Sequence, residues 1–261
     1  KQKTAYEMEG AMIKSYYAEK TGIDPKDIAV VSVMPCTAKK FEAKRPELSH
    51  NGLADVDVVI TTRELARMIK EAGIDFPNLP DEDFDSLLGE STGASVIFGA
   101  TGGVMEAALR TAYNMITGKE LEQVDLTAVR GVEGVKEASV QVGDLTVNVA
   151  VANGTANAAK LLAQVRSGEK QYHFIEVMGC PGGCVTGGGQ PIVSAQKRME
   201  CDPRAVRAAA LYREDANKPL RRSHENPEIK ALYADYLDAP NSHKAHELLH
   251  TTYTARAKYS K

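Results

Sequence analysis

Apolar runs of strand length alternate with amphipathic stretches over the first three quarters of the chain. Runs such as AVVSVM and TVNVAVA are almost continuously apolar, as expected of strands buried on both faces, and turn residues or helical patterns follow them. This alternation predicts an α/β protein with a largely parallel sheet. The expected strands are residues 29–34, 56–61, 95–99, 146–152 and 172–178.

Helices are predicted between these strands from apolar positions at helical spacing and from the glycines that stop the pattern. The segment 62–72 places Leu65, Met68 and Ile69 on one face and ends at Gly73. The other expected helices are residues 104–117, closed by Gly118, and 155–166, stopped by Gly168. Residues 76–90 contain two prolines and many acidic residues, so we expect an exposed loop there.

The character of the chain changes after Pro191. Residues 195–261 contain no strand-like run and show three short polar helical patterns, near 203–214, 227–237 and 242–251. Such a segment has too few apolar positions to form a core of its own, so we expect it to wrap around the α/β body. The sequence therefore predicts two parts, an α/β domain over residues 1–194 and a helical segment over residues 195–261.

Composition and charge narrow the class of protein. Of the 261 residues, 43% are hydrophobic and 26% are charged, an ordinary balance for a globular protein. A formal net charge of −3 argues against a nucleic-acid surface. No run of about 18 apolar residues predicts a membrane span, and the polar start does not resemble a signal peptide. Because the chain opens without Met on a stretch that reads as mid-protein, we expect further sequence upstream of Lys1.

The most informative segment is the glycine-rich stretch after the last expected strand. Cys180 and Cys184 are spaced C-x3-C, and five glycines lie between residues 182 and 189. Loops at the carboxyl ends of strands gather ligand residues in α/β folds, and glycine lets the backbone approach a bulky anionic group. The spacing does not suit a redox C-x2-C motif, and tetrahedral zinc would need a second tight cysteine pair. The pattern favours thiolate ligation of an iron–sulfur cluster.

A third cysteine also follows a strand. Cys36 comes directly after the strand at 29–34, and Lys39 and Glu42 lie within the next six residues. A lone cysteine in such a position is most often a small buried apolar residue. A lysine three residues further on can, however, donate hydrogen bonds to an anionic ligand. Lys39 and Glu42 can equally form a solvated ion pair at the start of a helix.

Together these segments resemble two signature motifs of the iron-only (FeFe) hydrogenases. The motif M-P-C-x-x-K-x-x-E matches residues 34–42, and the motif E-x-M-x-C-x-x-G-C-x-x-G-G-G-x-P matches residues 176–191, both without a departure. The segment FGATGGVMEAA at residues 98–108 extends the resemblance, which covers essentially the whole chain. It implies two lobes with mainly parallel sheets flanked by helices, a cofactor between the lobes, and an all-helical C-terminal belt like the family's separate small subunit.

The cofactor of this family is the H-cluster, a 4Fe–4S cube joined through a cysteine sulfur to a two-iron subsite with CO, cyanide and a bridging azadithiolate. The resemblance implies that the cube is ligated by Cys36, Cys180 and Cys184, with Cys184 as the bridge to the two irons. Lys39 would hydrogen-bond a cyanide, and Glu42 would be at most an accessory proton-path residue. The other residues expected around the subsite are Met34, Pro35, Gly99 and Met178.

The activity that the resemblance implies is the reversible reduction of protons to H2 with electrons from ferredoxin. The family's first signature, T-S-C-C-P, which supplies the fourth cube ligand and a proton-relaying cysteine, does not occur in this sequence. We therefore expect an upstream part of the same hydrogenase to supply it, with accessory 4Fe–4S or 2Fe–2S clusters, so that this chain alone is an incomplete enzyme. Cys201 is expected to be a structural thiol. H-cluster maturation proteins are a further implied partner, and the fused belt favours a cytoplasmic member over a periplasmic one.

Other interpretations stay open. The segment His246-Glu247-Leu248-Leu249-His250 is a literal H-E-x-x-H zinc-hydrolase pattern, although only residues 251–261 follow it, too few for the usual third ligand. Surface histidines on a belt helix are the plainer interpretation. The family also has sensory members and a non-catalytic relative in iron–sulfur protein assembly, which departs from the lysine and G-G-G-Q-P patterns that are intact here. An electron-transfer iron–sulfur module would need neither Lys39 nor both methionines.

Overall fold

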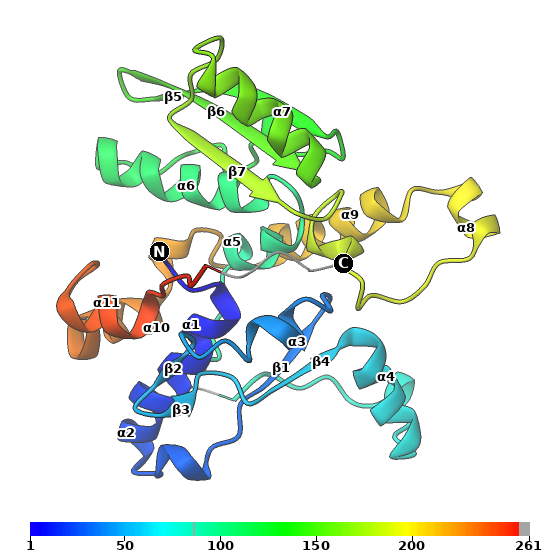
Figure 1. Cartoon of the computed structure of the whole chain (residues 1–261), viewed down its shortest axis with the longest axis vertical. Helices are drawn as coiled ribbons and strands as arrows, with labels where there is room; N and C mark the ends of the chain where they lie inside the picture. Colours follow the sequence, from blue (N-terminus) through cyan, green and yellow to red (C-terminus); the bar gives the residue numbers. More distant parts are fainter. Residues whose placement is uncertain (86, 256–261) are drawn as a thin grey trace. The chain divides into compact units, whose positions relative to one another are not determined.

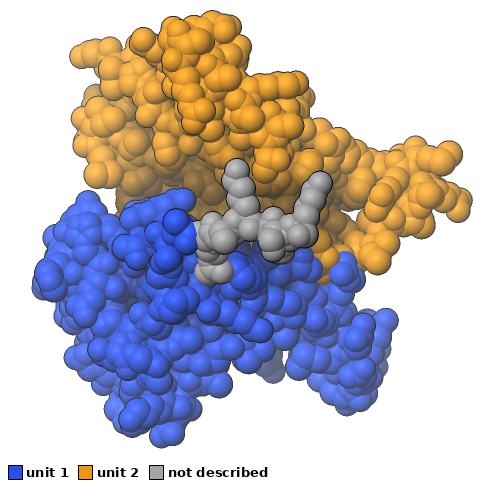
Figure 2. Space-filling view, in the orientation of Figure 1, with its two compact units in different colours: residues 1–83, 228–261 blue, residues 84–227 orange. Residues whose placement is uncertain are grey.

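The computed structural model describes residues 1–85 and 87–255, and these residues form two compact units. Of the described residues, unit 1 combines residues 1–83 with residues 228–255, which lie far apart in the sequence, whereas unit 2 lies within the continuous segment 84–227 (Figure 2). Strands and helices alternate in both units (Figure 1). The α/β class predicted from the sequence is therefore confirmed.

Unit 1 is built on a pair of parallel strands. β1 (Val31–Met34) pairs with β4 (Val58–Thr61), and Met34 lies opposite Thr61 at the carboxyl end of both strands. A small antiparallel pair, β2 (Ser49–His50) with β3 (Leu53–Ala54), connects them in the sequence. The buried core of this unit includes Val30, Val56 and Val59, with Tyr6, Ile13 and Met34 packed against it.

The helices of unit 1 come from both ends of the sequence. They are α1 (Ala5–Met12), α2 (Ala18–Thr21), α3 (Lys39–Glu42), α4 (Thr62–Glu71), α10 (Pro227–Leu232) and α11 (His243–Leu249). Helix α4 begins at a capping box, in which Thr61 and Glu64 satisfy each other's backbone amides, and it ends near the predicted Gly73. Helix α11 packs against α1, and the backbone amide of Lys3 donates to the carbonyl of Leu249 at 2.9 Å.

Unit 2 contains a three-stranded sheet in the order β5–β6–β7. The central strand β6 (Leu145–Asn153) pairs antiparallel with β5 (Val135–Val142) and parallel with β7 (Phe174–Met178). Helices α6 (Gly103–Thr117) and α7 (Thr155–Arg166) flank this sheet (Figure 1). The other helices of this unit are α5 (Gly93–Val96), α8 (Ala195–Glu200) and α9 (Pro203–Asn217).

From Val149 onward strand β6 is buried, because both of its faces are covered. Val149 and Val151 pack with Met105 and Leu109 of α6 on one face. On the other face, alternate residues of the same strand, Ala150 and Ala152, pack with Ala158 and Leu161 of α7. All four β6 residues have no exposed surface. The run TVNVAVA thus encodes a strand between two helix layers.

Two expectations about secondary structure in unit 2 were wrong. Residues 95–99 form the end of helix α5 and a short 3-10 helix, Ile97–Gly99, instead of a strand. A five-residue apolar run has the same composition in a buried strand and in a buried helical turn, and here Ala94 and Ile97 are fully buried in the helical form. Strand β5 was not predicted, because its first residues break the apolar–polar alternation of a strand: the charged Lys136 is buried and Val135 is exposed.

The C-terminal segment is helical where helices were predicted. Helices α9, α10 and α11 occupy the three expected positions, with a π-helical turn (Tyr233–Leu237) after α10, while α8 was not expected. Helix α9 packs against α5 within unit 2. Over the described part of the chain, no helix combines the length and apolar character that crossing a membrane requires.

Candidate metal centre

The first group of predicted site residues lies at the carboxyl end of β1 in unit 1. Met34 is the last residue of the strand, and Pro35, which has no backbone N–H to continue the pairing, and Cys36 follow it. All three are partly buried. Helix α3 then begins at Lys39, three residues after the cysteine. The thiol of Cys36 is therefore presented at a strand end, where α/β folds gather ligand residues.

Lys39 and Glu42 form an ion pair across the single turn of α3. Their side chains are 24% and 22% exposed, so the pair is neither fully solvated nor fully buried. The ring of Tyr6 lies 5.2 Å from the Lys39 ammonium. The ion pair between Lys39 and Glu42, which was the alternative to a ligand-binding role for Lys39, is thus present. It restricts the lysine side chain but leaves it partly exposed to an anionic ligand.

The second group lies in unit 2, in the loop after β7. Met178 ends this strand, and the loop from Gly179 carries Cys180 and then Cys184, the first residue of a short 3-10 helix. Gly182 and Gly183 adopt φ values of +85° and +98°, which side-chain-bearing residues rarely adopt. The two cysteines are therefore displayed on a loop whose path depends on glycine.

Gly183 brings this loop against the backbone that follows α5. A methyl group at Gly183 would lie 2.7 Å from the amide nitrogen of Thr101 and 2.8 Å from the carbonyl oxygen of Gly99. The amide of Thr101 donates to the carbonyl of Gly182 at 3.1 Å. The side chain of Asn153, at the end of β6, accepts from the amide of Gly182 at 2.9 Å. The structure thus brings Gly99 together with the Cys180–Cys184 loop.

Glu176, the first residue of the second motif, has a role that the sequence did not reveal. Its carboxylate is almost fully buried and accepts from the amides of Gly102 and Met105, each at 2.7 Å, at the start of helix α6. An anionic group at this position is favoured by the unpaired amides and by the helix dipole. Burial raises the pKa of Glu176, while the backbone hydrogen bonds oppose that shift.

Lys136 supports the same region from strand β5. Its buried ammonium donates to the carbonyl oxygens of Thr101 and Gly131 at 2.9 Å and 3.0 Å. Burial lowers the pKa of Lys136, and the nearby Glu176 carboxylate partly offsets this effect. The glutamate within the otherwise apolar strand β7 is the signal that could have identified Glu176 from the sequence. Together Lys136 and Glu176 fix the backbone that contacts the cysteine loop.

The predicted site residues therefore fall into two groups, one in each unit. Met34, Pro35, Cys36, Lys39 and Glu42 lie in unit 1, and Gly99, Met178, Cys180 and Cys184 lie in unit 2. None of the four cysteines forms a disulfide, so the three motif thiols are chemically available as ligands. Cys201 lies at the end of α8, and its thiol contacts the carbonyl of Lys197 at 3.5 Å.

Unit 2 also contains an acidic cluster with the spacing of a metal site. Among residues 1–85 and 87–255, it is the one group of three His, Cys, Asp or Glu side chains whose ligand atoms all lie within 4.8 Å of one another, and it consists of Glu106, Asp125 and Asp215. Three guanidinium groups already neutralise these carboxylates, namely Arg110, Arg130 and Arg221. The cluster is an internal ion network and leaves no need for a cation.

The H-E-x-x-H segment has a different geometry from a zinc site. His246 lies on α11, but His250 is the first residue after that helix, in an extended conformation. The Nδ1 atoms of the two histidines are 2.5 Å apart, a hydrogen-bond contact. The carboxylate of Glu247 faces His50 instead, with an N–O separation of 3.7 Å. Among the described residues, no third His, Cys, Asp or Glu side chain lies close enough to His246 and His250 to complete a zinc site.

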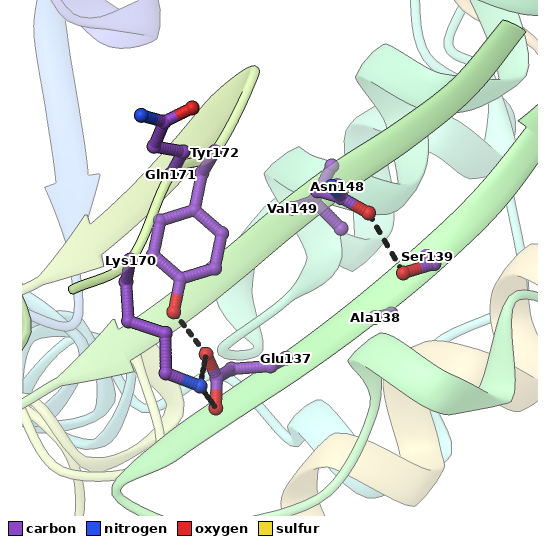
Figure 3. A pocket seen from close by; sticks show the side chains of 8 residues that line it. All are labelled: Glu137, Ala138, Ser139, Asn148, Val149, Lys170, Gln171 and Tyr172. Atoms are coloured by element: carbon purple, nitrogen blue, oxygen red, sulfur yellow. Dashed lines mark hydrogen bonds and ion pairs between the residues drawn. The ribbon is translucent and has the colours of Figure 1, made fainter. Parts of the chain in front are cut away.

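A shallow pocket of about 340 Å³ lies elsewhere in unit 2 (Figure 3). Lys170 and Tyr172, which precede β7, both contact Glu137 of β5 there, and Ser139 donates to Asn148 at 2.8 Å. None of the predicted ligand residues lines this pocket. The charged groups of this pocket, Lys170 and Glu137, pair with each other. The pocket contains no cysteine, so the candidate site remains the strand ends that carry Cys36, Cys180 and Cys184.

Comparison with known proteins agrees with this assignment. Residues 1–188 match the model of the iron only hydrogenase large subunit, C-terminal domain, and residues 201–256 match that of the iron hydrogenase small subunit. The chain belongs to the iron-only hydrogenase family.

The similar proteins include hydrogenases and an iron–sulfur cluster assembly factor. The chain is 54% identical over 256 residues to the NADP-reducing hydrogenase subunit HndD of Solidesulfovibrio fructosivorans, covering 98% of this chain and 43% of that protein. It is 30% identical over 263 residues to the cytosolic Fe-S cluster assembly factor narfl of Xenopus tropicalis, covering 98% and 54%. A solved structure of FeFe-hydrogenase HydA1 from Chlamydomonas reinhardtii matches with a TM-score of 0.81 and 44% identity, covering 97% of this chain and 70% of that one. The chain thus spans about half the length of these two curated relatives.

Proposed function

We propose that this chain forms the C-terminal part of the catalytic domain of an FeFe hydrogenase, which interconverts protons and H2 with electrons from ferredoxin or a similar carrier. The observation that supports it most directly is the Cys180–Cys184 loop, which glycines at positive φ hold against Gly99 and Thr101. Soft thiolates on such a loop suit an iron–sulfur cluster. The intact Lys39 pattern favours a catalyst over an assembly factor.

The residues present fit the H-cluster of this family. Cys36, Cys180 and Cys184 would ligate its cube, with Cys184 as the bridge to the two-iron subsite, and none of these thiols is in a disulfide. When bound, this group supplies heterolytic formation and cleavage of the H–H bond, with the amine of its azadithiolate carrying the proton. The fourth cube ligand and any accessory clusters would come from an upstream part of the same protein.

The protein side chains would orient and enclose this group. Lys39 would donate a charge-assisted hydrogen bond to a cyanide, and Glu42 holds the lysine by its ion pair. The polarisable side chains of Met34 and Met178 end the two strands that precede the cysteines, where they can fill irregular space. Pro35 and Gly99 would pack beside the diatomic ligands, since neither carries a long side chain. We further propose a cytoplasmic location and loading by H-cluster maturation proteins.

Infrared spectroscopy on the full-length protein that contains this chain, after maturation, tests the proposal. Bands of CO and cyanide are expected in the wild type. They should disappear in Cys184→Ser, which removes the proposed bridge, and persist in Cys201→Ser, which removes a thiol at the end of α8. An iron–sulfur signal without CO or cyanide bands in the wild type would instead assign an electron-transfer or assembly role and overturn the proposal.

A further inference from the structure

A row of hydrogen-bonded side chains in unit 1 joins helix α1 to the Lys39–Glu42 pair. The hydroxyl of Tyr6, on α1, lies 3.0 Å from Glu7 Oε1 and 3.3 Å from Glu42 Oε2. The same tyrosine places its ring 5.2 Å from the Lys39 ammonium. Tyr6 therefore contacts both members of the ion pair, one through its hydroxyl and the other through its ring.

Glu7 anchors this row. Its side chain belongs to a residue that is only 2% exposed, and its Oε2 accepts from the amide of Thr4 at 3.0 Å and from the hydroxyl of Thr4 at 2.9 Å. These bonds form the capping box of α1, so the carboxylate cannot rotate without loss of the cap. Its second oxygen is thereby fixed toward the Tyr6 hydroxyl.

Tyr6 remains a hydrogen-bond donor over the whole physiological range. Burial, and then the charges of Glu7 and Glu42, raise the pKa of its hydroxyl well above the ordinary value of 10.0. A single hydroxyl proton can be donated to one carboxylate at a time, so Glu7 and Glu42 compete for it. A change at Glu7 is therefore transmitted to Glu42.

Without Tyr6, the ion pair would be loosely held. Lys39 and Glu42 are three residues apart on a four-residue helix, and partly exposed pairs of this kind contribute little because two flexible side chains must be ordered. The hydroxyl and ring of Tyr6 restrict both side chains at once. The direction in which the Lys39 ammonium points thus depends on a residue 33 positions earlier in the chain.

We propose that Tyr6, held by Glu7, is a positioning residue that orients the Lys39 ammonium toward its anionic ligand. The identity of that ligand as a cyanide of the H-cluster rests on the function proposed above. The positioning itself rests on contacts that lie entirely within unit 1.

The test compares three variants of the full-length protein. Tyr6→Phe keeps the ring and removes the hydroxyl. Tyr16→Phe is the matched control, since it removes a hydroxyl from another buried ring of the same helical segment, one that packs on Tyr236 at 5.3 Å. Glu7→Gln keeps an oxygen that accepts from Thr4 but turns an amide NH2 group toward Tyr6. An NH2 group cannot accept a hydrogen bond, so the Tyr6 hydroxyl then donates to Glu42 alone.

Two measurements are needed. In the matured protein, the cyanide stretching bands should shift in Tyr6→Phe, shift the opposite way in Glu7→Gln, and stay in place in Tyr16→Phe. In the cluster-free protein, the 15N resonance of the Lys39 ammonium should move and broaden in Tyr6→Phe and remain unchanged in Tyr16→Phe.

The outcomes separate the two proposals. An unchanged Lys39 resonance and unshifted bands in a folded Tyr6→Phe protein overturn the positioning role. A wild type without CO or cyanide bands overturns the hydrogenase proposal, and the ammonium resonance then decides the positioning role alone. Melting temperatures of all three variants show whether a spectral change accompanies loss of the fold.

Discussion

Gly183 is the residue at which the loop between the two cysteines touches the neighbouring backbone. Its φ of +98° is one that residues with a side chain rarely adopt. An added methyl group would also lie only 2.7 Å from the amide nitrogen of Thr101, so both effects exclude a side chain here. Gly168, with φ of +78°, has nothing within 4 Å of such a methyl group and serves as the control for a positive φ without a close neighbour.

We expect Gly168→Ala to cost about 1–2 kcal/mol of unfolding free energy from its positive φ alone. Gly183→Ala should cost about 1–3 kcal/mol more, because the methyl group must displace backbone atoms and because the ψ of −164° at this residue is one that only glycine readily adopts. Urea denaturation of both variants measures the difference. Equal costs would mean that the cysteine loop does not depend on the close contact with residues 99–101.

The raised pKa of Glu176 predicts that its contribution to the free energy of unfolding depends on pH. Burial raises its pKa in the folded state above the ordinary value of 4.5. A carboxyl group with a raised folded pKa contributes most stability below its unfolded pKa and loses that contribution as the pH rises through the folded value. The unfolding free energy of the wild type, minus that of Glu176→Gln, should therefore fall as the pH increases across this window. Denaturant titrations from about pH 4 upward check it, and a rise of this signed difference with pH would contradict the role assigned to burial.

At the scale of elements, Arg110 connects helix α6 to helix α9. Its guanidinium is fully buried and binds both carboxylate oxygens of Asp215, at 2.9 Å and 2.8 Å, while also donating to Glu106 at 2.7 Å. Burial acts to raise the pKa of Asp215, but hydrogen bonds from Arg110 and Arg221 outweigh it and hold that pKa below 3.8.

Removal of one partner from this network leaves buried charges without compensation. Arg110→Met should lower the unfolding free energy by about 3–5 kcal/mol. Arg166→Met, at the exposed end of α7, is the control and should change it by less than about 0.5 kcal/mol. Thermal or urea unfolding measures both, and a small effect at Arg110 would show that the remaining arginines rearrange to cover the loss.

Some elements could be predicted from the sequence because local signals agree with the tertiary environment. Helix α7 has the predicted bounds, since the glycines at 154 and 168 border an amphipathic run. Residues 95–99 were misassigned because their burial comes from packing in the fold, which the local pattern does not contain. Strand β5 was not predicted because the charged Lys136 takes a buried position in it. The strand is defined by its pairing with β6, which the local sequence does not show.

The candidate site shows the same division. The cysteines and Lys39 could be proposed from motif spacing, because cluster ligation requires particular residue types at fixed intervals. The contacts of Glu176 with Gly102 and of Tyr6 with Glu42 join residues 74 and 36 positions apart. No spacing rule predicts such pairs, so the supporting residues of the site became visible only in the structure.

At the scale of the whole molecule, unit 1 depends on residues from both ends of the sequence. Leu248 of α11 is only 3% exposed, and this helix packs against α1. Leu248→Ala should lower the unfolding free energy by about 2–5 kcal/mol, because it leaves a cavity in that interface. Leu79→Ala, at a side chain that is 52% exposed, should have little effect.

Hydrogen exchange locates this loss. Peptides from α1 and α11 should exchange faster in Leu248→Ala, whereas those from α6 and α7, which pack on their own sheet, should keep wild-type protection. Equal acceleration in both units would show that the protein unfolds as a single cooperative body.

The discontinuous build of unit 1 also bears on synthesis. Residues 84–227 form a continuous unit that can fold as soon as they leave the ribosome, whereas α1 and the backbone near Lys3 wait for residues 228–251. The Cys180–Cys184 loop can therefore take its native path while Cys36 still belongs to an unfinished unit. Until residues 228–251 have emerged, a nascent chain has the Cys180–Cys184 loop in place but lacks part of the unit that holds Cys36, so we expect the three proposed ligands to act together only after that point.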